Sequence, residues 1–270
     1  MQSTIFYTFK PKIISYIVQI TTHSLYKEKE ALISQLVDDF LSSGDLIVQG
    51  ARNTIKSSNL EGEKINIKFF QKPGLFKSII YSFFRSTKAK RSFDYANYLL
   101  EHQIPTPFPV AYTEEKNGLG LLQDSYYICK HIDYDFTIRE LIHNPLFPDR
   151  NNILEQFAAF TYKMHEARVN FLDHSPGNTL IVNKGAGKYD FYLIDLNRMK
   201  FETLSIEARM DNFKKMWLSK TMVKVIAKKY AELSGQSEEK LQQLLLEKTK
   251  TFKGKITRKK YLKLKLKLMK

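Results

Sequence analysis

Three oxygen-bearing side chains between residues 170 and 200 have the types and spacing that phosphoryl transfer requires. Asp173 is followed five residues later by Asn178, and a second aspartate, Asp195, follows the apolar run 191–194. One carboxylate can orient a hydroxyl nucleophile, while an amide and a second carboxylate can hold the Mg²⁺ that bridges nucleotide phosphates. The alternative is ordinary turn chemistry, with Asp173 as a cap. Because Asp195 comes directly after an apolar strand, phosphoryl transfer is favoured over an ordinary turn.

The second half of the chain is predicted to be a mainly helical frame for these residues. Residues 170–200 are expected to form a loop and a strand pair, joined by a turn containing Gly185 and Gly187. His165 falls on an apolar helical face and is expected to be a core residue, because no histidine here has zinc-ligand spacing. Apolar spacing predicts helices over 137–143, 153–166, 206–219, 221–234 and 238–250.

The first half is predicted to be rich in strands. A helix over 28–41 ends near Gly44, and residues 46–70 follow as a three-stranded antiparallel meander with a turn at 59–62. In its third strand Lys68 lies on the face opposite Ile65 and Ile67. A helix over 86–101 stops before Pro105, since prolines exclude helix there, and strands are expected over 110–112 and 125–130.

These elements predict an α+β fold with two lobes, a β-rich N-lobe with one helix and a mainly helical C-lobe. Residues 1–24 are left open between an extra strand pair and a loosely attached extension. The expected division is 1–44 as N-terminal extension and helix, 45–130 as N-lobe, 131–250 as C-lobe and 251–270 as basic tail.

Of the 270 residues, 43% are hydrophobic and 13% are aromatic, a composition that is typical of a globular protein. A single cysteine, Cys129, excludes an intramolecular disulfide and suits a reducing compartment. The sequence has no run of eighteen apolar residues and no signal-peptide pattern. We therefore expect a cytoplasmic protein, or one bound peripherally to a membrane from the cytoplasmic side.

The formal net charge of +15 predicts an anionic partner. Basic residues gather at 85–91 and in the tail 251–270, which contains no acid and alternates leucine with lysine near its end. An extended tail would place its leucines on one side and dock on an anionic membrane; a solvated, disordered tail is the alternative. Nucleic acid is not expected, because no helix-turn-helix, zinc-finger or RRM signature accompanies the charge.

Six short motifs in a fixed order carry a family resemblance. The chain resembles the lipopolysaccharide kinase family, the Kdo and heptose kinases of Gram-negative bacteria, within the protein-kinase-like superfamily. The motifs are RNTIK (52–56), IKFFQKP (67–73), SFFRSTKAKRSFDYANYLL (82–100), IPTPFPVAY (104–112), DHSPGN (173–178) and LIDLNRMKF (193–201).

The resemblance implies a role for each matching residue. Lys68 would grip the ATP phosphates and pair with Asp94 on the following helix, with Glu101 as the competing acid. Asp173 would orient the acceptor hydroxyl and take up its proton, while Asn178 and Asp195 would hold Mg²⁺.

The nucleotide loop and the hinge are matched more weakly. Gly50 and Arg52 stand where protein kinases have three glycines, and Lys130 to Ile132 would form the hinge that pairs with adenine. Phe171 replaces a histidine usual in such kinases. Leu196-Asn197 replaces Phe-Gly and no A-P-E-like segment follows, so a small molecule or glycan is the expected acceptor.

The resemblance thus implies an ATP-dependent kinase that phosphorylates a Kdo or heptose hydroxyl of the lipopolysaccharide inner core. Its substrate would be a lipid-anchored glycan of the lipid A–Kdo type. Two alternatives stay open: an aminoglycoside- or RIO-type kinase on the same fold, and a non-catalytic pseudokinase, suggested by Phe171, the thin glycine loop and Asp94 in place of Glu. The oligomeric state is not indicated.

Overall fold

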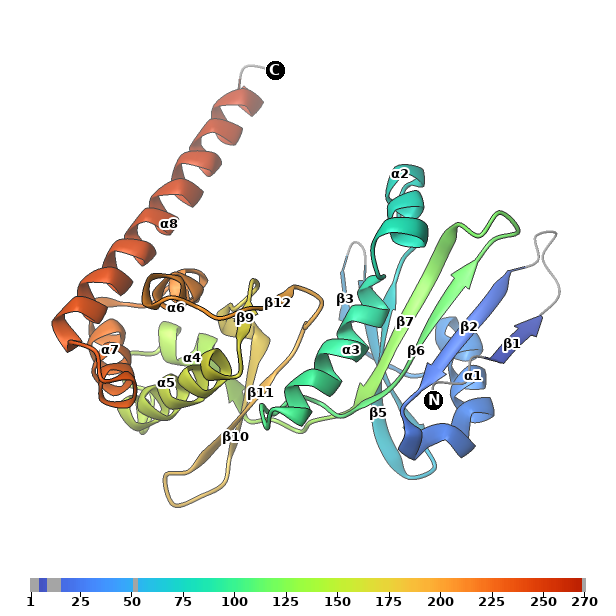
Figure 1. Ribbon diagram of the computed structural model, residues 1–270, viewed down its shortest axis with the longest axis horizontal. Helices are drawn as coiled ribbons and strands as arrows, with labels where there is room; N and C mark the ends of the chain where they lie inside the picture. The colour runs from blue at the N-terminus through green and yellow to red at the C-terminus, as the bar shows by residue number, and fades with distance from the viewer. Residues whose placement is uncertain (1–4, 9–15, 51–52, 269–270) are drawn as a thin grey trace. The chain divides into compact units, whose positions relative to one another are not determined.

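The computed structural model describes residues 5–8, 16–50 and 53–268. The chain divides into two compact units (Figure 1). The N-terminal unit comprises Met1–Glu101 and Pro107–Ile132, and the C-terminal unit comprises His102–Thr106 and Asp133–Lys270. Among the described residues, no helix combines the length and apolar character needed to cross a bilayer.

A seven-stranded sheet forms the centre of the N-terminal unit, in the order β1-β2-β6-β7-β5-β4-β3, with every neighbouring pair antiparallel. The predicted meander is present as β3, β4 and β5, and Glu61-Gly62 forms its second turn with positive φ at both residues. The strands are β1 (Ile5–Thr8), β2 (Ile17–Thr22), β3 (Asp45–Gln49), β4 (Asn53–Leu60), β5 (Glu63–Phe70), β6 (Pro109–Lys116) and β7 (Leu122–Lys130).

The sheet is larger than the five strands predicted. Of the two alternatives left open for residues 1–24, the structure has the strand pair, in which β2 joins the sheet beside β6 with Ile17 opposite Lys116. Strands β6 and β7 also extend beyond the predicted ranges because their hairpin continues to a turn at 117–121. The β-branched residues of β2 gave no clean alternation, so only pairing with β6 identifies this strand.

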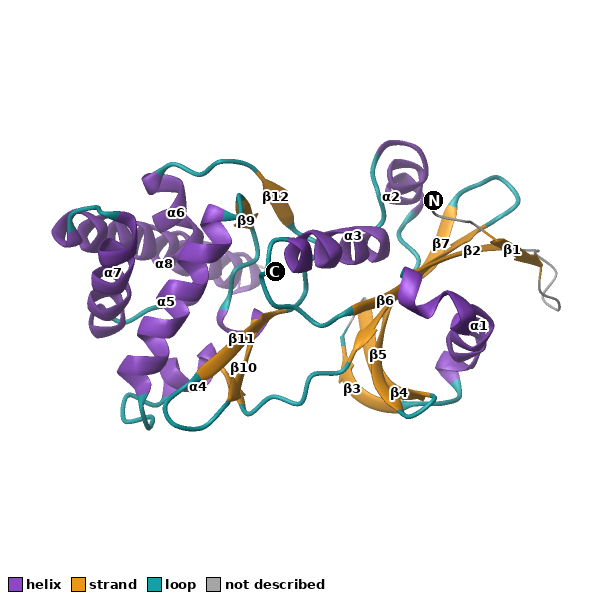
Figure 2. Cartoon of the chain, turned by 60° about the horizontal axis from the view of Figure 1, so that its bottom comes forward, coloured by secondary structure: helices purple, strands orange, loops and turns teal. Residues whose placement is uncertain are grey.

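Helices α1 (Glu30–Asp38) and α3 (Lys88–Glu101) cover opposite faces of the sheet (Figure 2). On the α1 face, Ile33 and Val37 pack with Ile65 and Ile67 of β5. Lys68 lies on the other face, as the alternation along β5 predicts. There it stands opposite Tyr127 of β7 in the ladder.

A short helical segment between β5 and α3 was not predicted. Helix α2 (Leu75–Ile79) begins after Pro73-Gly74 and continues as a wide turn over Ile80–Phe84. The segment is apolar at most positions, so it shows no stripe of helical period in the sequence.

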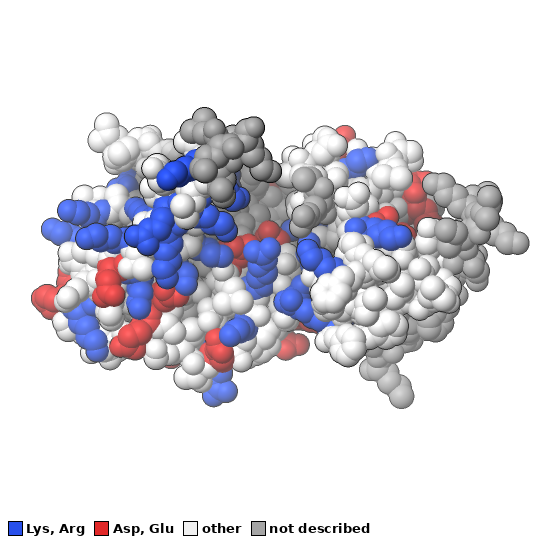
Figure 3. Space-filling model, turned by 90° about the horizontal axis from the view of Figure 1, so that it is seen from above, with Lys and Arg blue, Asp and Glu red and all other residues white. Residues whose placement is uncertain are grey.

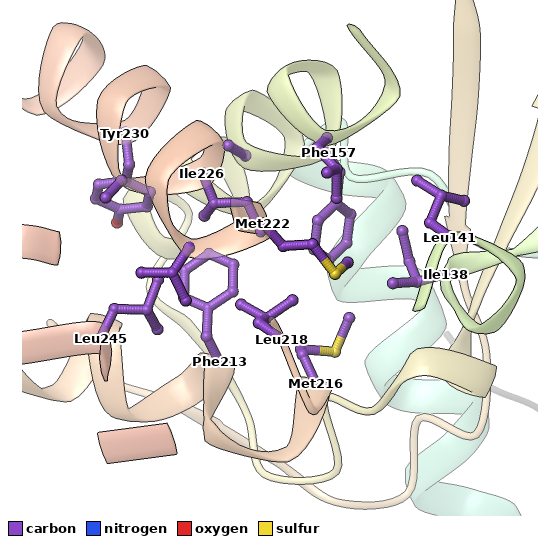
Figure 4. Close-up of a cluster of buried hydrophobic side chains, with 14 of the residues drawn as sticks. Ile138, Leu141, Phe157, Phe213, Met216, Leu218, Met222, Ile226, Tyr230 and Leu245 are labelled. Atoms are coloured by element: carbon purple, nitrogen blue, oxygen red, sulfur yellow. The ribbon is translucent and has the colours of Figure 1, made fainter. Parts of the chain in front are cut away.

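The C-terminal unit is mainly helical with two small sheets, one of β8, β10 and β11 and one of β9 and β12. Its core forms where α5 and α7 pack together, and Figure 4 shows Phe157, Phe213, Met222 and Tyr230 converging there. The elements are β8 (Phe136–Thr137), α4 (Ile138–His143), α5 (Arg150–Glu166), β9 (Val169–Phe171), β10 (Thr179–Asn183), β11 (Tyr189–Leu193), β12 (Met199–Phe201), α6 (Ile206–Asn212), α7 (Lys220–Ser234) and α8 (Glu238–Leu268).

Two predictions in this unit are wrong. The helix expected over 206–219 ends at Asn212, a 3₁₀ turn follows over Phe213–Met216, and Trp217 leaves it with a left-handed φ of 57°. The tail expected to be extended or disordered is instead the second half of α8, which runs to Leu268. Leucine and lysine are both strong helix formers, and in a helix their alternation spreads the leucines around the axis rather than along one side.

Candidate active site

The loop that carries Asp173 is held at both ends by backbone hydrogen bonds. Before it, the Leu172 amide donates to the Arg198 carbonyl at 3.0 Å. After it, the amides of His174 and Asn178 donate to Phe171 and Ser175 at 3.1 and 2.9 Å. Pro176 begins the 3₁₀ turn that ends at Asn178. The missing amide hydrogen of proline has no cost at the first position of a turn. Asp173 therefore lies on a short turn that is held by backbone hydrogen bonds on both sides.

Hydrogen bonds also bring the three predicted reaction residues of this unit together. The Asn178 amide nitrogen donates to the Asp173 carbonyl at 2.8 Å. In turn the Ile194 backbone amide donates to the Asn178 carbonyl at 3.0 Å. Since Asp195 is the next residue, Asp173, Asn178 and Asp195 belong to one connected loop system although 22 positions separate the first from the last.

Two cations contact the Asp173 carboxylate. Lys215 donates to Oδ1 at 2.8 Å, and Arg198 lies 3.5 Å from Oδ2. Lys215 also donates to the Leu172 carbonyl at 2.6 Å, which fixes its ammonium beside the loop. The carboxylate keeps 26% of its surface exposed, so it remains open to a substrate. Charge-assisted contacts of this kind hold a carboxylate in one orientation.

Asp195 adopts a left-handed backbone conformation with φ of 58°. Its Oδ1 accepts from the buried Asn197 side chain at 2.7 Å. Aspartate tolerates positive φ better than most residues, and backbone strain of this kind clusters at active sites. Because the Asn178 side-chain nitrogen is used by the Asp173 carbonyl, Asn178 Oδ1 and the Asp195 carboxylate are oxygen donors of the type that Mg²⁺ prefers.

A buried polar network supports the loop from below. Asn212 donates through Nδ2 to the Asn170 side chain and the Phe171 carbonyl, both at 3.0 Å. Its Oδ1 therefore accepts from His174 Nδ1 at 2.9 Å and from His165 Nε2 at 3.3 Å. The Tyr230 hydroxyl lies 2.8 Å from His165 Nδ1.

Burial keeps both histidines of this network neutral, although their hydrogen bonds to Asn212 act in the opposite direction. Burial lowers the pKa of His165 to about 3 and the pKa of His174 to about 4. The expectation that His165 is a satisfied core residue is confirmed. Asn212 was not singled out, because it lies far along the chain from the loop and its partners are visible only in the fold.

The exposed side of the loop faces a cavity of about 640 Å³ within the C-terminal unit. Arg139 enters it from α4, whose start is fixed by a capping box between Thr137 and Glu140. Arg139 lies so close over Gly177 that a Cβ there would meet the guanidinium at 2.5 Å. Residues that line the cavity beside Asp173 include Arg139, His143, Ser175, Lys215, Trp217 and Phe252.

Trp217 is the single tryptophan of the chain and remains 40% exposed. The buried side chains of Phe213 and Met216 anchor the turn before it, so that Lys215 and Trp217 face outward. Phe252 of α8 packs edge-on against the indole at 6.0 Å between ring centroids. The positive φ of Trp217 strains the backbone. Strain of this kind persists only where the surrounding structure holds the residue in place.

In the N-terminal unit, Lys68 lies on β5 with its ammonium 5.4 Å from the centroid of the Phe70 ring. Lys88, at the start of α3, lies 5.6 Å from the same ring. The neighbouring Cys129 is buried, and this burial raises the pKa of its thiol to about 12. A thiol that stays protonated is not a nucleophile at neutral pH.

Asp94 lies on the part of α3 that covers β6. It forms an ion pair with Lys90 at 2.9 Å, one helical turn earlier, and Lys90 lies 5.5 Å from the centroid of the Tyr112 ring. Tyr112 is two strands away from Lys68, or about 10 Å across a sheet. The pairing of Lys68 with Asp94 stays a prediction, and Glu101 is exposed at the helix end.

The remaining nucleotide predictions concern the turn after β3 and the end of β7. The Gly50 amide donates to the Asn53 carbonyl at 2.9 Å, and a Cβ at Gly50 would meet Asn53 Oδ1 at 2.8 Å. Arg52 falls outside the described residues. At the predicted hinge the amides of Lys130 and His131 already donate to Phe108 and Lys64. The hinge prediction now depends on Ile132.

Comparison with known proteins identifies the family. Residues 50–244 match the lipopolysaccharide kinase (Kdo/WaaP) family. The chain belongs to this family. Among solved structures it is similar to that of WaaP in complex with acyl carrier protein, with a TM-score of 0.60 and 14% sequence identity. The match covers 87% of this chain and 98% of that chain, and it shows a common fold. No curated protein matches the sequence.

Membership of the lipopolysaccharide kinase family makes the protein a phosphotransferase that uses ATP and acts in lipopolysaccharide synthesis. It thereby favours the first interpretation over the aminoglycoside-type and pseudokinase alternatives. The bilobal α+β prediction is also confirmed. Phe171, the departure that had suggested a pseudokinase, is a buried residue that stacks on His174 at 5.9 Å between ring centroids. It is part of the packing that supports the Asp173 loop.

Proposed function

We propose that this lipopolysaccharide kinase transfers the γ-phosphoryl group of ATP to a hydroxyl of Kdo or heptose in the lipopolysaccharide inner core. The observation that carries the proposal is the connected loop system of Asp173, Asn178 and Asp195. Its donor set is one orienting carboxylate and two metal-type oxygen donors, as phosphoryl transfer requires.

Asp173 is the proposed catalytic carboxylate. It accepts the proton of the attacking hydroxyl late in the transfer, when the new bond to phosphorus is largely formed. The contacts from Lys215 and Arg198 hold its two oxygens in a fixed orientation. Pre-orientation of this kind lowers the entropic part of the activation free energy. Positioning of the reacting groups is a main source of rate acceleration in kinases.

Asn178 and Asp195 are the proposed Mg²⁺ ligands, and the ion when bound neutralises charge on the ATP phosphates. In the N-terminal unit, Lys68 is proposed to contact the phosphates with Asp94 as its partner acid. Gly50 and Arg52 are proposed to cover the phosphates, and the stretch from Lys130 to Ile132 to pair with adenine. Lys68 suits its role because it projects from the interior of a strand rather than from a mobile loop.

The cavity beside Asp173 supports an anionic sugar as the acceptor. Arg139 and Lys215 line it with positive charge, and Trp217 offers an exposed aromatic face. Guanidinium and ammonium groups bind carboxylate and phosphate, and the aromatic face suits the C–H surface of a sugar ring. A Kdo carboxylate, or a phosphate beside a heptose, matches this lining.

The basic helix α8 supports docking on an anionic membrane, where a lipid-anchored substrate of the lipid A–Kdo type resides. Lys and Arg side chains gather on the C-terminal unit around α8 in Figure 3. Between Lys255 and Lys265 the helix carries Lys255, Arg258, Lys259, Lys260, Lys263 and Lys265 and no acid. Each contributes about 1 kcal/mol near an anionic leaflet. The proposed location is the cytoplasmic face of the inner membrane.

The test is a mass-spectrometric assay of purified protein with Mg-ATP and Kdo-bearing lipid A. Addition of one phosphate by the wild type, and none by an Asp173→Ala variant, is the expected result. A heptose-bearing acceptor in a parallel reaction separates the two sugars. ATP binding without transfer to either acceptor would refute the proposed substrate.

A further inference from the structure

The segment Leu75–Phe84 has its polar and apolar sides reversed relative to an ordinary surface helix. Ser78 is buried, and its hydroxyl donates to the Leu122 carbonyl at 2.5 Å. One turn later, Ser82 accepts from the Leu122 amide at 2.8 Å. Two serines four positions apart therefore fasten the segment to the start of β7. In a soluble protein the inward face of a helix is normally its apolar face.

The opposite side of the segment exposes large hydrophobic side chains. Leu75, Phe76, Phe83 and Phe84 have 71%, 76%, 64% and 80% of their surfaces exposed, and Ile79 adds 38%. Positions 75, 79 and 83 are one helical turn apart, so these side chains share one face. Single exposed apolar residues are common, but a contiguous group of five marks a site of interaction.

Positive charge surrounds this apolar face. From residue 64 to residue 93 the sequence contains no acid and eight basic residues. Lys72, Lys77, Arg85 and Lys88 lie closest to the segment in the chain. Behind the face is a cavity of about 650 Å³, lined by Phe70, Leu75 and Phe76 together with Lys72, Lys77 and Lys88. Lysines at the rim of an apolar hollow suit lipid phosphates above acyl chains.

The segment also projects from its unit. Figures 1 and 2 both show α2 beyond the N-terminal end of α3, where the serines of the segment bond to the start of β7. A protruding apolar face bordered by cations is complementary to an anionic bilayer. It is a poor match for a second copy of this chain, because two such faces would bring their lysines and arginines together.

We propose that Leu75–Phe84 is a membrane-docking segment that inserts its leucine and phenylalanine side chains into the headgroup region of an anionic bilayer. The surrounding lysines and arginines contact the lipid phosphates, as in other interfacial amphipathic elements. The wide turn over Ile80–Phe84 lets Phe83 and Phe84 reach the same surface as Phe76. This contact is separate from the one proposed for α8 and needs no catalytic residue.

Sedimentation with vesicles of phosphatidylcholine and phosphatidylglycerol tests the proposal. We expect the double variant Phe76→Ser/Phe83→Ser to bind at least about tenfold more weakly than the wild type, through loss of inserted apolar area. The matched control is Leu119→Ser, a leucine that is 79% exposed at another turn of the same unit; it should bind as the wild type does. Equal binding by the double variant would overturn the proposal.

Two further measurements separate the possible occupants of this face. A variant with Lys259, Lys260 and Lys263 changed to Gln weakens the α8 contact alone, and its residual binding should still depend on Phe76 and Phe83. A Phe83→Trp/Trp217→Phe protein should shift its fluorescence to the blue on addition of anionic vesicles. Lack of a shift, or a dimer in solution that dissociates in the double variant, would assign the face to another partner.

Discussion

The two units of this protein place polar and apolar side chains in opposite ways. In the C-terminal unit, polar groups are buried: His165 and His174 both bond to Asn212 beneath the Asp173 loop. In the N-terminal unit, apolar groups are exposed: Leu75–Phe84 turns its serines inward and its phenylalanines outward. Each arrangement departs from the usual pattern of apolar inside and polar outside.

The two arrangements indicate different demands of function on stability. A buried network of hydrogen bonds is rigid and favours one arrangement, which suits a loop that holds a carboxylate in place. An exposed apolar face costs little folding free energy but needs a partner surface. We therefore expect the C-terminal unit to be sensitive to polar substitutions inside, and the N-terminal unit to be sensitive to apolar substitutions outside.

The largest expected effect is on the reaction itself. Asp173→Asn removes the carboxylate that we propose as the proton acceptor, and we expect activity to fall by about 10³-fold. Transfer to the acceptor is measured by mass spectrometry. The control is Glu155→Gln, an exposed acid of the same unit, which should keep full activity. An active Asp173→Asn protein would show that the rigid loop serves another purpose.

Acid pH should destabilise the C-terminal unit. The folded-state pKa values of His165 and His174, about 3 and about 4, lie below the unfolded value near 6.5. Their contribution is present above pH 6.5 and is lost as the pH falls, by about 2 kcal/mol for each histidine at pH 5. Urea unfolding followed by fluorescence of Trp217 measures it.

The exposed His143 supplies a control for this pH dependence. His143→Gln should leave the acid profile unchanged, while His165→Gln should flatten it. Equal stability of the wild type at pH 7.5 and pH 5 would contradict the buried, neutral histidines.

Removal of Asn212 should break the network at its centre. Asn212→Ala removes the acceptor of two imidazole N–H groups and the donor to the Asn170 side-chain oxygen, and we expect a loss of about 2–3 kcal/mol. The free energy of unfolding should fall, and activity with it, because the Asp173 loop loses its support. Asn151→Ala, at an exposed position on α5, is the matched control.

Substitution of Trp217 tests whether the cavity beside Asp173 binds the acceptor. Trp217→Ala should raise the KM for the acceptor about tenfold, or about 1.4 kcal/mol, with little change in the KM for ATP. Trp217→Phe should restore part of the affinity because it keeps an aromatic face. An equal rise in both KM values would indicate a general loss of structure.

The smallest effect is expected in the N-terminal unit. There, stability should fall as the pH rises, whereas the buried histidines lower stability as the pH falls. Burial, with Asp124 and Asp38 nearby, raises the pKa of Glu115 to about 7. Its contribution is therefore present below pH 4.5 and is lost as the pH rises through 7. Glu115→Gln should stabilise the protein at pH 8 by about 1 kcal/mol after solvent screening, measured by circular dichroism. Glu101→Gln, at an exposed site, should not.

The proposed reaction residues could be named from the sequence because they are close together in it or follow a local pattern. Asp173 and Asn178 lie within one turn, Asp195 follows an apolar strand, and the alternation along β5 places Lys68 opposite Ile65 and Ile67. Strand alternation depends only on neighbouring residues. Short motifs in fixed order were also sufficient to indicate the family that the comparison shows.

Other features depended on contacts between distant residues. The alternation of leucine and lysine in the tail suggested an extended chain, but helix propensity and continuity with the start of α8 made it a helix. The strand β2 is defined by pairing with β6, about 90 residues later. No local signal predicts such pairing.

By itself, the sequence determined the α+β class, the order of the main strands and helices, and the chemistry available at Asp173, Asn178 and Asp195. The tertiary structure alone decided that Asn212 lies beneath this loop and that Ser78 and Ser82, rather than the phenylalanines between β5 and α3, face the protein. The physical reason is that side-chain type and spacing are local properties, whereas burial and hydrogen-bond partners are set by which distant segments pack together.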